Sequence, residues 1–180
     1  VQFLRRVTEP VLEPIRRETP DAPSVLSLRG LALYRLGRYS AAAKELEELR
    51  HEADFADLMP VLMDCRRAQK RHGAVDKLWE ELRATSPGAA IVAEGRIVAA
   101  GSKADRGKLD EGIALLERAP RAKGRAKDHN IRVTYALADL YERAGDLPRA
   151  RALFEEVRLA QSDFADVADS RWRASCMNSQ

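Results

Sequence analysis

A short phrase that occurs near both ends of the chain constrains the fold more than any other feature of the sequence. Residues 33–42 read LYRLGRYSAA and residues 140–150 read LYERAGDLPRA, with two weaker copies between them. A unit that recurs in this way is typical of a helical hairpin, which cannot bury its apolar face alone and becomes stable by stacking on its neighbours. The repeat therefore predicts an array of helical hairpins.

The copies align on one turn residue in each hairpin. The turn residues are Gly37, Lys70, Gly107 and Gly145, at spacings of 33, 37 and 38 residues. Five residues after each turn the residue is small or fairly small, as in Ala42, Val75, Gly112 and Ala150. Nine residues after each turn it is large, as in Leu46, Trp79, Leu116 and Phe154. Seven residues before each turn come Gly30, Met63, Ala100 and Ala138.

These columns have the pattern of closely packed antiparallel helices. Small residues let two helix backbones approach each other, and a large residue one turn later fills the gap beside the next hairpin. The column two residues after each turn is expected to pack the elbow of the hairpin, through Tyr39, His72, Leu109 and Leu147. Several columns in the same register predict that all four hairpins share one packing scheme.

The pattern resembles the tetratricopeptide repeat family, whose unit is a helix–turn–helix of about 34 residues. Repeats are expected at about 23–56, 56–89, 93–126 and 131–164, and the first and fourth match best. The second has Lys70 where the family has a turn glycine, and the third has Gly112 where the family prefers Ala. Residues 63–67 (MDCRR) and 96–101 (RIVAAG) more narrowly resemble a bacterial tetratricopeptide family of unknown function.

The resemblance implies an all-α fold, a right-handed superhelix (α-solenoid) of about four such hairpins with terminal capping helices. Residues 23–164 would form the array. Residues 1–22 are expected to form an N-terminal cap of one or two short helices, and residues 165–180 a C-terminal capping helix and tail.

The composition agrees with a folded helical protein. Apolar residues make up 45% and charged residues 33% of the sequence, and the formal net charge is only +3. Aromatic residues are only 6%, so Leu, Ala and Val must supply most of the core, which favours helices over sheet. Two distant cysteines, Cys65 and Cys176, form no disulfide framework, and the absence of a signal peptide or transmembrane stretch predicts a cytoplasmic protein.

The sequence contains no motif for catalysis, for a metal or for a cofactor. His51, His72 and His129 lack any metal-ligand spacing, and no glycine-rich phosphate loop is present. Cys65 falls in a column that packs between helices, so a buried structural thiol is expected there rather than a nucleophile. The chain is therefore predicted not to be an enzyme, and to need no cofactor.

The resemblance implies instead that a peptide or another protein binds on the concave face, along the first helices of successive hairpins. The groove columns contain Tyr and Arg beside acidic groups, a mixture that often anchors protein interfaces. They do not reproduce the Lys and Asn carboxylate clamp of some family members. The alternative is that these groups pair with one another across neighbouring repeats. The candidate partner-binding residues are Tyr34, Arg35, Asp64, Arg67, Asp105, Tyr135, Asp139 and Arg143.

Two basic clusters, at residues 66–72 and 121–127, support a second interpretation, a nucleic-acid-associated protein. No aromatic residue is interleaved with either cluster, and a solvated surface is the alternative explanation. The candidate nucleic-acid contacts are Arg66, Lys70, Arg71, Arg121, Lys123, Arg125 and Lys127. A third interpretation is self-association, as a homodimer, through apolar surface on the terminal helices. No membrane contact is expected.

Overall fold

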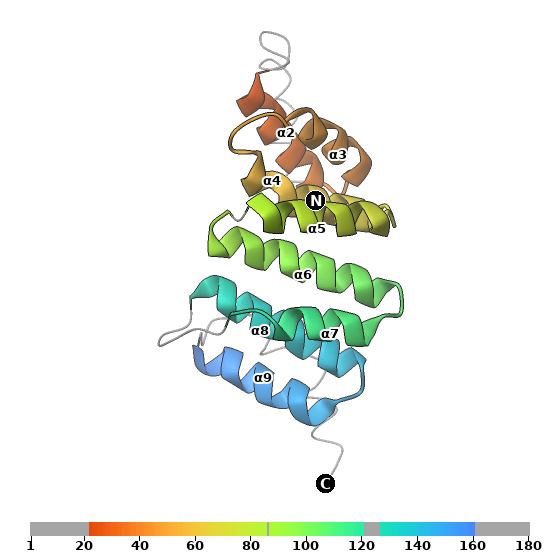
Figure 1. The fold of residues 1–180 in the computed structure, drawn as a ribbon, viewed down its shortest axis with the longest axis vertical. Helices are drawn as coiled ribbons and strands as arrows, with labels where there is room; N and C mark the ends of the chain where they lie inside the picture. The colour runs from red at the N-terminus through yellow and green to blue at the C-terminus, as the bar shows by residue number, and fades with distance from the viewer. Residues whose placement is uncertain (1–21, 86, 121–126, 161–180) are drawn as a thin grey trace. The chain divides into compact units, whose positions relative to one another are not determined.

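A computed structural model describes residues 22–85, 87–120 and 127–160, and it contains only helices in these ranges (Figure 1). The helices follow one another in pairs that are joined by short turns, so the all-α prediction is confirmed. The expected terminal caps lie outside the described residues. The helices are α2 (Pro23–Arg35), α3 (Tyr39–Glu48), α4 (Phe55–Ala68), α5 (His72–Thr85), α6 (Ala89–Asp105), α7 (Leu109–Glu117), α8 (Asp128–Arg143) and α9 (Leu147–Ala160).

The turn within each pair has a left-handed backbone at the residue on which the sequence copies align. The φ angles are +73° at Gly37, +59° at Lys70, +77° at Gly107 and +83° at Gly145. After the first turn, the Arg38 amide donates to the Leu33 carbonyl oxygen at 2.9 Å, and the same bond recurs in the other three turns. This is the Schellman motif, which satisfies the last carbonyls of a helix and reverses the chain. The predicted turn alignment is therefore confirmed, including the position where lysine replaces glycine.

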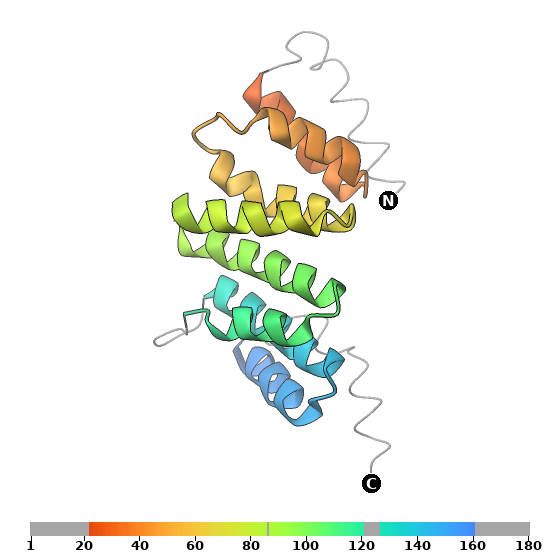
Figure 2. The same cartoon turned by 45° about the vertical axis from the view of Figure 1, so that its right-hand side comes forward.

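Contacts among the helices divide the chain into two compact units, residues 1–102 and 103–180. In the first unit α2 contacts both α3 and α4, and α4 contacts α3 and α5. Helices α5 and α6 lie side by side in both Figure 1 and Figure 2. They approach closely at Gly95, where an added Cβ would lie 2.2 Å from the Leu82 Cδ2 atom. Gly95 lies outside the predicted columns, but the same kind of contact occurs within them, because an added Cβ at Gly30 would lie 2.7 Å from the Leu46 Cδ2 atom.

In the second unit α8 packs between α7 and α9. The core of this unit consists of buried side chains from all three helices, namely Ile113, Leu116, Ile131, Val133, Ala138, Leu140, Tyr141, Ala150, Phe154 and Val157. Both large and small column residues are buried here, as expected.

The elbow column is the exception to the predicted packing. Leu147 is 50% exposed and Tyr39 is 37% exposed, so the expectation that this column packs the elbows is wrong at these two positions. All four column residues begin the second helix of their hairpin, but His72 and Leu109 are partly buried, and His72 reaches Ser102 on the next hairpin.

Candidate functional site

In the first unit, the first helices α2 and α4 bring three predicted partner-binding residues together, namely Tyr34, Asp64 and Arg67. The Tyr34 hydroxyl on α2 donates a hydrogen bond of 2.8 Å to Asp64 Oδ2 on α4. One helical turn further along α4, the Arg67 Nη1 atom lies 3.8 Å from Asp64 Oδ1. Asp64 therefore holds a tyrosine of the preceding hairpin and an arginine of its own helix.

The guanidinium group of Arg67 reaches α6, where it lies against Gly101. A Cβ atom at Gly101 would lie 2.6 Å from Arg67 Nη1 and 2.7 Å from Cζ. Because glycine has no side chain there, the guanidinium can rest on the α6 backbone. We call Tyr34, Asp64, Arg67 and Gly101 the Tyr34 cluster. It connects α2, α4 and α6.

The three side chains of the Tyr34 cluster are partly exposed, while Gly101 is buried. The side chains of Arg67 and Asp64 are 29% and 31% exposed. Burial, and then the hydrogen bond to Asp64, raise the pKa of the Tyr34 hydroxyl well above its ordinary value. The hydroxyl therefore keeps its proton and remains a donor to Asp64. The result is an ordered polar surface that a partner can still reach.

The second unit contains a separate group of predicted residues around Arg143. Its Nη1 atom lies 3.8 Å from Asp139 Oδ2, and its Nη2 atom lies 4.0 Å from Asp105 Oδ1. The Tyr135 ring packs edge-on against the Phe154 ring, with centroids 5.5 Å apart, so this tyrosine takes part in the contact between α8 and α9. In the first unit, by contrast, Arg35 is exposed at the end of α2. Several of the candidate residues thus pair with one another, as the alternative interpretation expected.

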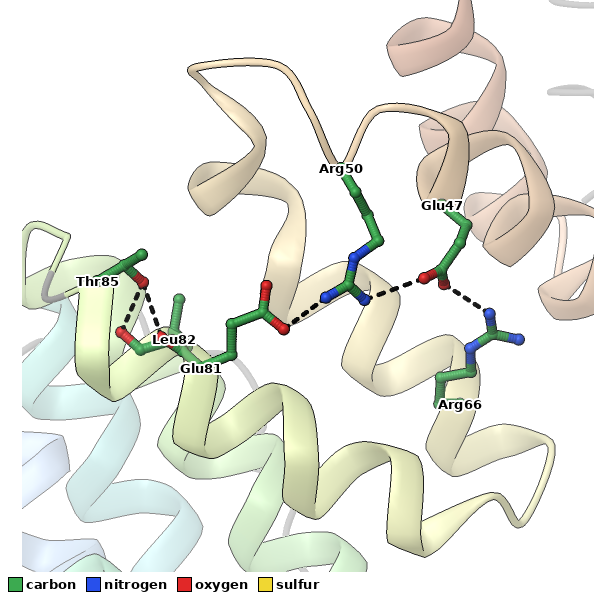
Figure 3. A network of polar contacts seen from close by, with 6 residues as sticks. All are labelled: Glu47, Arg50, Arg66, Glu81, Leu82 and Thr85. Atoms are coloured by element: carbon green, nitrogen blue, oxygen red, sulfur yellow. Dashed lines mark hydrogen bonds and ion pairs between the residues drawn. The ribbon is translucent and has the colours of Figure 1, made fainter.

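The members of the basic cluster at 66–72 contact different neighbours. Arg66 Nη2 forms an ion pair of 2.7 Å with Glu47 Oε2 on α3, and Glu47 also accepts a hydrogen bond of 3.0 Å from Arg50. Arg50 in turn reaches Glu81 on α5 at 2.5 Å (Figure 3). Burial opposes ionisation of Glu47, but hydrogen bonds from Arg66 and Arg50 outweigh it and lower its pKa. Arg66 therefore helps to hold three helices together.

The other members of the two basic clusters also differ in their surroundings. Lys70 and Arg71 are exposed at the turn between α4 and α5. The His72 Nδ1 atom lies 2.9 Å from the buried Ser102 hydroxyl oxygen on α6. Lys127 is exposed at the start of α8. Arg121, Lys123 and Arg125 lie outside the described residues.

The described ranges contain no group of three His, Cys, Asp or Glu side chains that could hold a metal ion. Cys65 is fully buried, and burial, followed by the charge of Asp64, raises the pKa of its thiol to about 11. A thiol in this environment stays protonated and inaccessible. No helix within the same ranges is long and apolar enough to span a membrane.

The network that joins Arg66, Glu47, Arg50 and Glu81 is what sequence reasoning missed. Only the i, i+3 spacing of Glu47 and Arg50 is visible in the sequence, because the other two residues come from different helices. The contact of Gln69, in the 66–72 segment, with the backbone of the exposed Tyr39 was missed for the same reason, since Tyr39 belongs to the preceding hairpin.

Residues 131–156 match a family model described as a tetratricopeptide repeat. The match covers most of α8 and α9 and contains Tyr135, Asp139 and Arg143. No curated protein matches the sequence. The chain thus contains a tetratricopeptide repeat motif in an all-helical repeat fold.

Proposed function

We propose that this chain is a non-catalytic protein-interaction scaffold that binds a peptide or a partner surface along the first helices of its hairpins. The tetratricopeptide repeat motif at 131–156 supports the general class, since repeat arrays of this kind provide extended binding surfaces. The observation that carries the proposal is the Tyr34 cluster, which presents polar side chains from successive first helices as one connected surface.

The Tyr34 cluster has two properties of a recognition site. Tyrosine and arginine are the residue types that most often anchor protein interfaces, because each combines a large contact area with hydrogen-bond donors. Their side chains are also held in place before a partner arrives, Tyr34 by Asp64 and Arg67 by Asp64 and the α6 backbone. Such preorganisation reduces the entropy lost on binding. A partner segment would therefore bind across α2, α4 and α6.

An affinity pull-down from native lysate tests this proposal, followed by titration of the recovered partner. Arg67→Glu reverses the central charge of the cluster and should weaken partner binding at least tenfold. Lys77→Glu is the matched control, because Lys77 is exposed on α5 and outside the cluster. Equal affinity of wild type, Arg67→Glu and Lys77→Glu for the same partner would refute a site at the Tyr34 cluster.

Arg143 and its two carboxylates are proposed as a weaker contact in the second unit. Asp139 and Asp105 lie 3.8 Å and 4.0 Å from its guanidinium nitrogens, so part of its charge is already compensated within the protein. Arg143→Glu should therefore reduce affinity for the same partner less than Arg67→Glu does. If Arg143→Glu reduced affinity more than Arg67→Glu in the same titration, the main site would lie in the second unit instead.

A further inference from the structure

The first two hairpin turns form a second polar surface in the first unit. Gln69, just after α4, donates a hydrogen bond from Nε2 to the Tyr39 carbonyl oxygen at 3.2 Å, which joins the two turns. A shallow hollow beside this bond is lined by both turns and includes Tyr39, Ser40 and Gln69. A second hollow shares Ser40 and extends along α3 and α4 to Lys44 and Arg66. We call this region the elbow surface.

The elbow surface carries an excess of positive charge. The basic residues that line the two hollows are Arg38, Lys44 and Arg66. Two more, Lys70 and Arg71, directly follow Gln69 in the chain. The acidic residues of the lining are Glu47 and Glu48. Glu47 forms ion pairs with Arg66 and Arg50, so Glu47 and Arg66 compensate each other and the exposed Glu48 remains as the acidic member of the lining. Lys44, Lys70 and Arg71 are all exposed. The surface is therefore suited to a ligand with several negative charges.

An exposed tyrosine, Tyr39, lines the first hollow of this surface. Tyr39 is 37% exposed, and its ring is held edge-on to Tyr34 with centroids 5.9 Å apart. Aromatic rings beside cations are the usual arrangement for single-stranded nucleic acids, in which the phosphates pair with Lys and Arg and the bases stack on the rings. The fold thus supplies the aromatic residue that the 66–72 segment lacks in sequence.

The lining of the hollows favours a nucleic acid over an acidic peptide. The residues between the charges are Gly37, Ser40, Ala41, Ala68 and Gln69, and both hollows are shallow. Neither hollow offers a packed pocket for an anchoring side chain, whereas Tyr39 in the first hollow offers a base a ring for stacking, which acidic side chains do not use. We propose that the elbow surface binds single-stranded nucleic acid, with Lys44, Lys70 and Arg71 at phosphates and Tyr39 stacked on a base.

Fluorescence anisotropy of the full chain with fluorescein-labelled dT15 and rU15, in 50 mM NaCl, tests this proposal. Lys44→Glu/Arg71→Glu should weaken binding at least tenfold. The slope of log Kd against log salt concentration should also decrease by about 1.4, because the variant loses two phosphate contacts and each contributes about 0.7 for a single strand. Tyr39→Ala should weaken binding about tenfold without changing this slope, since stacking releases no counterions. Tyr39→Phe should bind like wild type.

Lys77→Glu/Arg118→Glu is the matched control, because it makes the same change in net charge at exposed positions outside the elbow surface. This variant should stay within about twofold of wild type, and circular dichroism should show that every variant is folded. The proposal is overturned by an absence of binding in 50 mM NaCl, by equal losses in this control, or by an unchanged affinity of Tyr39→Ala. Displacement of the oligonucleotide by poly-glutamate as readily as by unlabelled oligonucleotide would also overturn it and assign the surface to acidic polypeptides.

Discussion

At the scale of single residues, Lys70 occupies a hairpin turn that requires a left-handed backbone, a conformation unfavourable for lysine. Its φ of +59° makes it the one non-glycine residue in the described ranges with a left-handed backbone. That conformation costs an L-residue about 1–2 kcal/mol, whereas a glycine loses about 0.5–1 kcal/mol more backbone entropy on folding. Lys70→Gly should therefore raise the free energy of unfolding by about 0.5–1 kcal/mol, as measured by urea denaturation.

The three glycine turns provide the reverse experiment. Gly107→Ala places a Cβ on a residue with a φ of +77° and should lower the free energy of unfolding by about 1 kcal/mol. Nothing lies within 4 Å of that Cβ, so backbone strain is the physical cause rather than a clash. Stabilisation by Gly107→Ala, or destabilisation by Lys70→Gly, would contradict this account of the turns.

Gly95 and Gly101 lie on the same helix, but they should respond differently to alanine. At Gly95 the new Cβ would meet Leu82 in the core, so Gly95→Ala should destabilise the protein by about 1–3 kcal/mol. At Gly101 the nearest atoms would be those of the terminal guanidinium of Arg67, which can shift without moving the backbone. Gly101→Ala should leave the unfolding free energy within about 1 kcal/mol of wild type, because alanine also favours the helix. It should still weaken partner binding by displacing the guanidinium. Equal thermal shifts for the two variants would contradict this distinction.

At the scale of helices, the Glu47 network joins α3, α4 and α5 through side chains alone (Figure 3). The pKa of Glu47 is lowered in the folded state, so its ionised form stabilises the fold at pH values above the ordinary carboxyl pKa of about 4.3. This stabilisation is lost as the pH falls through the folded-state pKa. The Glu47 side chain is 37% exposed, so solvent limits the effect to about 1 kcal/mol or less.

Glu47→Gln should therefore reduce the free energy of unfolding at pH 7 and leave it nearly unchanged at pH 3. The measurement is urea denaturation of wild type and variant at both pH values. Glu48→Gln is the control, because Glu48 is an exposed neighbour without a part in the network. The account fails if Glu47→Gln costs as much at pH 3 as at pH 7.

Helix-scale features divide clearly into those that the sequence predicts and those that it does not. The turn positions and the buried columns follow from local rules, because a left-handed turn and a close helix approach restrict residue type at fixed spacing. The contacts of Arg66 and Arg67 do not follow. Arg66 reaches Glu47 on α3, whereas Arg67 reaches Gly101 on α6. The two arginines are neighbours in sequence, but adjacent residues on a helix point about 100° apart. Their partners come from other helices, so only the tertiary structure identifies them.

At the scale of the whole molecule, the division into two units predicts local rather than uniform responses to core mutation. In repeat proteins each hairpin depends mainly on its neighbours. Leu116 is 2% exposed in the second unit, so Leu116→Ala should destabilise by about 2–5 kcal/mol. Hydrogen exchange should accelerate more in α7 and α8 than in α2 to α4. Equal acceleration along the chain would indicate that the two units open as one.

The Tyr34 cluster also has a consequence for the primary structure of a partner. Packed helix axes are about 8–10 Å apart, and an extended chain advances about 3.3 Å per residue. A bound strand that crosses α2 and α4 near Tyr34 and Asp64 would therefore meet successive helices with every third residue. The recognition motif should then show a period of three, with the intervening positions free to vary.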